Sequence, residues 1–169
     1  MRIRCGNRCR IPLDNGYLTI SGNDTSTQFF TASVADELLL NTRLTEESKN
    51  KTRILLNELG LYEYMDAHPS ALSGGQKQRL AFACAIFSGR RILILDEPTS
   101  GLDGQNMRLI AERLRSEARN GRTILVITHD GELIESCCDT VCGIFKEEPD
   151  GRLKPAKLRY RRHASNRPV

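Results

Sequence analysis

Two short apolar segments, at positions 92–95 and 123–128, stand out from the mixed polar and apolar residues along the chain. Both include β-branched residues and lack polar alternation, which is typical of strands covered on both faces of a sheet. Asp96 and Glu97 follow the first run, and His129 follows the second. Because ligands of open parallel sheets bind beyond the carboxyl ends of the strands, we expect these residues to border one site.

The segment between the two runs has the period of an amphipathic helix. Its apolar residues recur at spacings of three and four, at Met107, Ile110, Ala111, Leu114 and Ala118. Charged residues, including Glu117, fill the positions between them, and Gly121 follows the expected end of the helix. A strand, a helix and a second strand in this order predict a right-handed βαβ unit with parallel strands.

The chain upstream of these strands is expected to be helical. Ser33 and Asp36 have the spacing of a capping box, and Thr45 precedes a second helical periodicity that stops at Gly60. Residues 31–72 are therefore interpreted as a small helical region inserted before the α/β part.

A further helix is expected to begin after Ser73 and to continue to about residue 87. Ser73 and Gln76 have capping-box spacing, and the intervening Gly74 and Gly75 allow close approach to the backbone. A helix amino terminus attracts phosphate through its free amides and its dipole. The alternative is that the segment is an ordinary helix cap.

Four more polar residues are candidates for phosphate chemistry. Asp96 is suited to hold Mg²⁺ through water, and Glu97 to orient or deprotonate water that attacks a phosphoryl group. Asp103 ends a Ser-Gly-Leu-Asp segment, and His129 follows an apolar strand. Each also has a purely structural explanation, since acidic pairs at strand ends are often solvated, Asp103 is a good helix cap, and a loop histidine is common.

In this order and spacing, the segments together resemble the ABC ATPase family. The Leu-Ser-Gly-Gly-Gln-Lys-Gln-Arg of residues 72–79 is similar to the family's signature, and residues 92–97 are similar to its Walker B strand with the catalytic glutamate. Residues 100–103 resemble its D-loop, and His129 resembles its switch histidine. The resemblance extends over residues 16–151.

The resemblance implies an α/β fold, namely a partial P-loop NTPase core of the ABC type with parallel strands and crossover helices, plus an inserted α-helical subdomain. The implied divisions are an unmatched basic segment at 1–15, an incomplete ABC ATPase domain at 16–151 and a basic tail at 152–169. Within the domain, residues 16–30 are the Q-loop region, 31–72 the helical subdomain, and 73–151 the part with the signature, Walker B, D-loop and switch histidine.

The resemblance also implies residue roles and cofactors. Glu97 and His129 are the expected catalytic residues, and Asp96 is the expected ligand of Mg²⁺ through water. The expected nucleotide-binding residues are Ser73, Gly74, Gly75, Gln76 and Asp103. The Q-loop pattern near Gln28 places the family's glutamine position on Asn23. The implied cofactors are ATP and Mg²⁺.

In this family two nucleotide domains enclose ATP head to tail, and the signature of one subunit covers the nucleotide of the other. The resemblance therefore implies a second ABC ATPase subunit, as a homodimer or heterodimer, and a membrane permease contacted by the helical subdomain. Residues 28–37 are most similar to energy-coupling-factor and cobalt-type importers. That segment and the lack of a long coiled coil disfavour a DNA-repair or chromosome ATPase, so nucleic acid is not an expected partner.

The sequence departs from the family at the phosphate loop, which requires Gly-x4-Gly-Lys-Ser/Thr. No Gly-Lys dipeptide occurs, and only 71 residues precede Leu72. We therefore expect the isolated chain to bind Mg-ATP weakly and to have no ATPase activity. Three interpretations remain open: a truncated ATPase subunit of an importer, a non-catalytic chain whose residues 73–76 complete the ATP site of a partner, and an inert gene remnant.

Charge is unevenly distributed along the 169 residues. The formal net charge is +4, but residues 1–10 and 152–169 contain eleven basic and no acidic residues, which leaves −7 on the rest. Solvated tails are the expected explanation, with contact to anionic lipid or RNA as the alternative. No apolar run is long enough to span a bilayer, and residues 1–16 lack the apolar segment of a secretory signal. A cytoplasmic location, peripheral on the inner face of the cell membrane, is expected.

Six cysteines are present, and two pairs of them have Cys-x3-Cys spacing, at 5 and 9 and at 138 and 142. A zinc site built from these pairs is disfavoured because the spacing is loose and the pairs are far apart in the sequence.

Overall fold

The computed structural model describes residues 18–21, 29–40, 42–141 and 161–162. The predicted Q-loop positions Asn23 and Gln28, the segment 1–15 and most of the tail at 152–169 lie outside these residues. The helices are α1 (Val34–Leu39), α2 (Glu46–Glu58), α3 (Gly74–Phe87), α4 (Gly104–Arg119) and α5 (Gly131–Cys137), with 3-10 turns at Tyr62–Tyr64 and Pro69–Ala71.

The central sheet is parallel, which confirms the predicted α/β class. Its strands β1 (Leu18–Ser21), β2 (Ile92–Asp96) and β3 (Thr123–Ile127) lie in the order β1-β2-β3. In β2 and β3, Ile92 pairs with Thr123 and Asp96 pairs with Ile127, so both strands end at the same edge. A separate antiparallel pair joins β4 (Thr140–Val141) and β5 (Arg161–Arg162).

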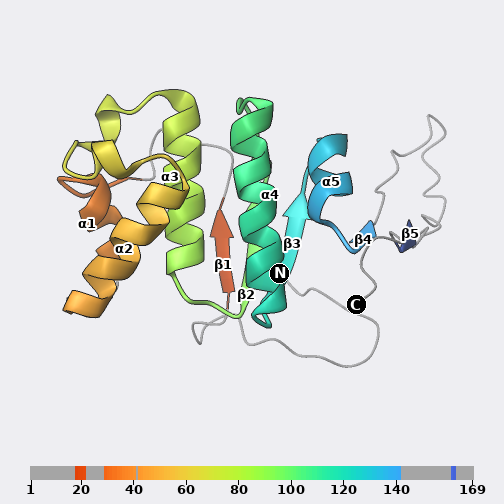
Figure 1. Ribbon diagram of the computed structural model, residues 1–169, viewed down its shortest axis with the longest axis horizontal. Coiled ribbons are helices and arrows are strands. Elements are labelled where there is room, and N and C mark those ends of the chain that lie inside the picture. Colours follow the sequence, from red (N-terminus) through yellow and green to blue (C-terminus); the bar gives the residue numbers. More distant parts are fainter. Residues whose placement is uncertain (1–17, 22–28, 41, 142–160, 163–169) are drawn as a thin grey trace, which may run out of the picture.

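The helices divide the molecule into a helical part and an α/β part (Figure 1). α1 and α2 lie at one end beside α3, whereas α5 lies at the other end next to β3. α3 contacts both parts, since it packs on α1 and α2 as well as on β1. It has no single apolar face, and five of its residues are buried in one core with residues of β2 and α4: Leu80, Phe82, Ala83, Ala85 and Ile86.

Each of the five helices in the described residues begins at a residue whose side chain accepts a hydrogen bond from the first turn. These caps are Ser33, Thr45, Ser73, Asp103 and Asp130. The expected helix starts after Ser33, Thr45 and Ser73 are therefore confirmed, because these side chains satisfy amides that have no partner within the helix.

The prediction that both apolar segments form strands covered on both faces is wrong for β3. β2 is covered as expected, and Leu93 and Leu95 are fully buried. β3, however, alternates between exposed and half-buried residues, and Leu125 and Ile127 are 49% and 48% exposed. The reason is position, because β3 has no strand on its outer side within the described part of the chain.

The predicted core face of α4 is also wrong at one position. Ala118 is exposed, whereas Glu117 is 5% exposed. Glu117 tolerates burial because Arg113 and Arg122 bind its two oxygens, at 2.7 Å and 3.0 Å. A buried carboxylate is expensive unless it is paired in this way.

None of the described helices is both long enough and apolar enough to cross a lipid bilayer.

Candidate functional site

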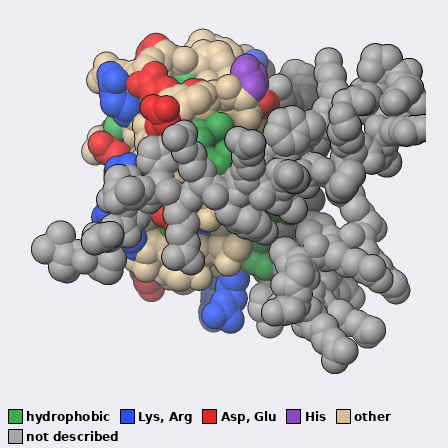
Figure 2. Space-filling view, turned by 90° about the vertical axis from the view of Figure 1, so that its right-hand side faces the viewer, with side chains coloured by type: hydrophobic (Ala, Val, Ile, Leu, Met, Phe, Trp, Pro, Cys, Tyr) green, Lys and Arg blue, Asp and Glu red, His purple; other side chains and the backbone are tan. Residues whose placement is uncertain are grey.

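Those residues predicted for chemistry that the structure describes gather at the end of the molecule where the parallel strands stop and α3 and α4 begin (Figure 1). Figure 2 shows histidine and acidic side chains at the surface near this end, with hydrophobic side chains exposed below them.

Glu97 follows β2 and has an unusual backbone conformation. Its φ angle is 47°, and it is the one described residue other than glycine with a positive φ. Such a conformation costs free energy for a residue with a Cβ atom, so neighbouring contacts must hold it. The Glu97 amide donates to the carbonyl of Ile127 at 2.8 Å, and the Glu97 carbonyl accepts from the amide of Ser100 at 3.1 Å.

The Glu97 carboxylate points at the loop after β3. Its Oε1 atom lies 2.7 Å from His129 Nδ1 and accepts from the His129 amide at 3.2 Å. Its Oε2 atom accepts from the hydroxyl of Thr128 at 3.1 Å. The hydrogen bond and the negative charge of Glu97 raise the pKa of His129 above its ordinary value. Glu97 and His129, which follow the two predicted strands, therefore lie together as the sequence predicts, and their role in one functional site stays a prediction.

The loop after β3 is fixed to the segment after β2 by a second long-range contact. The hydroxyl of Thr99 donates to Asp130 Oδ2 at 2.8 Å, and the other oxygen of Asp130 caps α5. The side chain of His129 nevertheless remains 88% exposed, whereas that of Glu97 is 19% exposed. The imidazole is thus accessible from outside while the carboxylate is held in place.

The start of α3 has the predicted capping box. The Ser73 hydroxyl accepts from the amide of Gln76, and Gln76 Oε1 accepts from the amide of Ser73 at 2.7 Å. Ser73 and Gly74 are exposed, and nothing lies within 4 Å of a Cβ atom built on Gly74. This end of the helix is open to solvent on the Gly74 side.

Gly75 connects the start of α3 to the turn that precedes α4. A Cβ atom built there lies 3.4 Å from Leu102 Cδ2 and 3.7 Å from the carbonyl oxygen of Gly101. The predicted signature and D-loop segments are therefore neighbours within this chain. Asp103 caps α4 and accepts from Asn106 at 2.8 Å, and the hydrogen bonds from Asn106 lower the pKa of Asp103.

Asp96 is the last residue of β2 and is half-buried. Among the described residues no group of three His, Cys, Asp or Glu side chains is close enough to hold a metal ion. Mg²⁺ is commonly held by one or two carboxylates together with water and substrate phosphates. A single carboxylate at a strand end fits a magnesium ion that is held through water and relies on phosphate for its other contacts.

Gln78 was predicted only as part of a motif, without a role of its own. It is 7% exposed on the second turn of α3, and its Nε2 atom donates to the carbonyl of Glu97 at 2.9 Å. Thr128, the second partner of the Glu97 carboxylate, was expected only as the last strand residue. No sequence signal identifies either contact, because each joins residues at least 19 positions apart.

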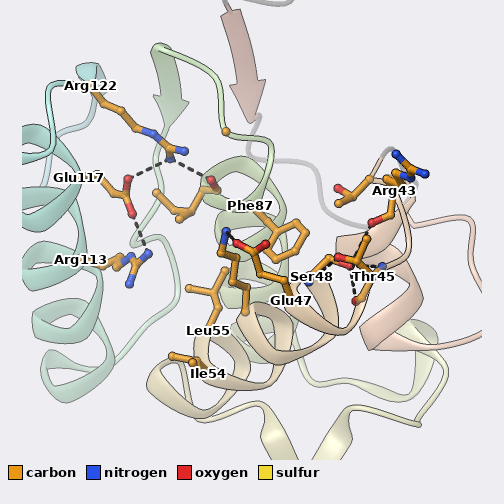
Figure 3. Close-up of a pocket in the computed structure, with 14 residues that line it drawn as sticks. Arg43, Thr45, Glu47, Ser48, Ile54, Leu55, Phe87, Arg113, Glu117 and Arg122 are labelled. Atoms are coloured by element: carbon orange, nitrogen blue, oxygen red, sulfur yellow. Dashed lines mark hydrogen bonds and ion pairs between the residues drawn. The ribbon is translucent and has the colours of Figure 1, made fainter.

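A hollow of about 540 Å³ lies away from this end, between α2, the carboxyl end of α3 and α4 (Figure 3). Its apolar lining comes from Ile54, Leu55, Ile86 and Phe87. Its charged lining comes from Arg43, Lys51, Arg113, Arg122, Glu47 and Glu117. Basic side chains therefore outnumber acidic ones in this hollow.

The sequence profile of the ABC transporter family matches residues 12–100. The methionine import ATP-binding protein MetN of Escherichia coli (strain K12) is 42% identical over 117 residues, which are 69% of this chain and 34% of MetN. The solved structure of cbiO1 from Clostridium perfringens, part of the ABC transporter complex cbiONQ, is 32% identical with a TM-score of 0.60. That likeness covers 75% of this chain and 53% of cbiO1. The chain thus spans about half of cbiO1 and a third of MetN.

Proposed function

This chain belongs to the ABC transporter family, and from that premise we propose that it is an ATP-binding subunit of an importer whose nucleotide site is shared with a second ATPase subunit. An importer of the energy-coupling-factor or cobalt type agrees best with residues 28–37 and with the likeness to cbiO1. In this proposal the chain lies on the inner face of the cell membrane and binds ATP with Mg²⁺.

The observation that carries the proposal is the open start of α3. Its capping box binds the amides of Ser73 and Gln76, while Gly74 leaves the helix terminus accessible to an anion from another molecule. The adjoining turn with Gly101 and Leu102 extends the same surface to Asp103. Residues 73–76 and Asp103 would contact the phosphates of a nucleotide that the second subunit holds.

The strand-end residues have complementary roles in the proposal. Mg-ATP supplies the phosphoryl group that water attacks and the positive charge that stabilises its oxygens. Asp96 would hold the ion through water, and Glu97 would orient the attacking water or take its proton. His129 keeps the Glu97 carboxylate directed at the loop after β3, because its Nδ1 atom and its amide both bind Oε1.

A second candidate function is favoured by the absence of a Gly-Lys dipeptide from the sequence. These 169 residues contain no Gly-x4-Gly-Lys-Ser/Thr segment, and in this candidate they donate only their signature surface to a partner, without catalysing hydrolysis at their own strand ends. Removing one preorganised donor to developing negative charge costs about 10² to 10³ in rate, and here a whole loop of donors is involved.

The helical part is the proposed contact with the permease. The hollow between α2, α3 and α4 supports this contact, since it combines an apolar floor with charged side chains at its edge, among them Arg43 and the paired Lys51 and Arg122 (Figure 3). A permease segment with apolar and acidic side chains would match it in size and charge.

The test mixes the chain with a complete ABC import ATPase from the same genome. That partner has its own phosphate loop, but the serine of its signature is replaced by arginine so that its homodimers are inactive. We expect added chain to restore ATP hydrolysis, because residues 73–76 supply the missing surface. The Ser73→Arg variant of the chain is the matched control and should restore nothing.

A second partner separates the two candidates: it keeps its signature, but the glutamate that follows its own Walker B strand is replaced by glutamine. Turnover with this partner that the Glu97→Gln variant abolishes supports catalysis by this chain's own strand-end site, whereas no turnover with it supports the signature-donating function. The chain alone should show no ATP hydrolysis. Failure of the unmodified chain to restore any turnover would contradict both candidates.

A further inference from the structure

Gln78 makes a contact that joins the signature helix to the end of the Walker B strand. Its side chain is almost fully buried, and its Nε2 atom donates to the Glu97 carbonyl at 2.9 Å. A buried amide group that makes no hydrogen bond is destabilising, so this bond also keeps Gln78 in one orientation. Gln78 lies two residues after Gln76, at the same end of α3 as the proposed nucleotide surface.

The bond ends on the one described residue other than glycine that has a positive φ. Glu97 has a φ of 47°, and its peptide groups are held from three directions. β3 binds its amide through Ile127, the following turn binds its carbonyl through Ser100, and α3 binds the same carbonyl through Gln78. Of these three contacts, only that of Gln78 comes from a side chain and from a helix.

The direction of the Glu97 carboxylate depends on this backbone conformation. If φ returned to an ordinary negative value, the Cα–Cβ bond would turn relative to β2, and the contacts of Oε1 with His129 and of Oε2 with Thr128 would be lost. The carbonyl contact of Gln78 opposes that rotation, because the peptide groups on both sides of the Glu97 Cα are hydrogen-bonded and a change of φ must move one of them and break a hydrogen bond.

We propose that Gln78 is a positioning residue that holds Glu97 in its left-handed backbone conformation, so that the start of the signature helix controls where the Glu97 carboxylate points. Any movement of α3 relative to β2 then reaches the carboxylate through one hydrogen bond. The catalytic meaning of that control rests on the proposed function, whereas the positioning itself does not.

The experiment measures the pKa of His129 by nuclear magnetic resonance of the labelled imidazole in the full chain. The charged groups that act on His129 are Glu97, after β2, and Asp130, at the start of α5. The Gln78→Met variant keeps a long unbranched side chain but has no amide donor. We expect its His129 pKa to fall to the value found in the Glu97→Gln variant, because the contact with the carboxylate is lost.

Gln105→Met is the matched control, since Gln105 is an exposed glutamine at the start of α4. It should leave the His129 pKa at the value of the unmodified chain. An unchanged His129 pKa in folded Gln78→Met, judged by circular dichroism, would overturn the proposal. Neither result depends on ATP hydrolysis, so failure of the proposed function would be seen separately.

A second measurement covers the case in which Gln78→Met does not fold. In the unmodified chain, one side-chain amide proton of Gln78 should exchange slowly with solvent and should show a scalar coupling across the hydrogen bond to the Glu97 carbonyl carbon. Rapid exchange of both Gln78 protons with no such coupling would overturn the proposal.

Discussion

The start of α3 and the end of β2 lie at the same end of the molecule but are built in different ways. At the start of α3, the capping contacts join Ser73 to Gln76, three positions apart. At the end of β2, the carboxylate contacts join Glu97 to residues 31 and 32 positions away. The first region forms from local sequence, whereas the second exists only when the sheet and the loop after β3 are assembled.

This difference bears on what each region can do. The α3 start needs only one turn of helix and leaves its glycine side open, which suits a surface completed by another molecule. The β2 end holds Glu97 in a costly conformation by contacts with three other segments, which suits a group whose direction must be fixed. Changes to the core should therefore damage the second region more than the first.

The largest effect is expected from Leu95→Ala. Leu95 is fully buried in β2, directly before Asp96, and belongs to the main core. Replacing a buried leucine by alanine costs about 2–5 kcal/mol through lost apolar contact and the remaining cavity. Urea unfolding followed by circular dichroism measures the loss of stability.

Leu125→Ala is the control for that substitution, because Leu125 lies on the neighbouring strand but is half-exposed. It should cost less than about 1 kcal/mol, as exposed substitutions usually do. Equal losses for the two variants would mean that β2 does not form the buried centre of the sheet.

Ser73→Ala should have an intermediate effect on stability. It removes the hydroxyl that caps α3 and should cost about 1 kcal/mol of unfolding free energy, measured in the same way. Ser73→Asp should lose much less, because aspartate also accepts from the first-turn amides. If aspartate were as damaging as alanine, the cap would not explain the stability of this helix end.

The contrast between local and long-range contacts also explains which parts of the fold the sequence predicts. The helix starts at Ser33, Thr45 and Ser73 are predicted correctly because a cap and its partner are three residues apart. The burial of Glu117 and the exposure of Leu125 are missed, since the first depends on Arg122 across a turn and the second on which strands join the sheet. Helical or strand periodicity carries no information about either partner.

Some features of the candidate site are likewise predictable from the sequence, and others are not. The residue types at 73–76, 96–97 and 129 predict phosphate chemistry, and the meeting of Glu97 with His129 follows from the rule that parallel strands end at one edge. The positive φ of Glu97 and its bond from Gln78 do not follow from any pattern, because glutamate has no preference for that conformation.

The smallest effect on stability is expected from a change of pH, which acts through the pair of Glu97 and His129. Because Glu97 raises the pKa of His129 in the folded chain above 6.5, the folded state binds a proton more tightly than the unfolded state. The contribution of the pair is therefore fully present below about pH 6.5 and is lost as pH rises through the higher folded-state pKa.

The effect should be modest and sensitive to salt, because the imidazole is 88% exposed and its charge is screened by solvent. The measurement compares the unmodified chain with Glu97→Gln in urea at about pH 6 and about pH 9, on either side of the usual histidine range. The unmodified chain should lose more stability than Glu97→Gln between these two values. His68→Gln should leave that difference unchanged, since His68 lies in a separate turn and contacts Ser70. If His68→Gln abolished the difference and Glu97→Gln did not, the pH dependence would belong to the helical part and not to the strand ends.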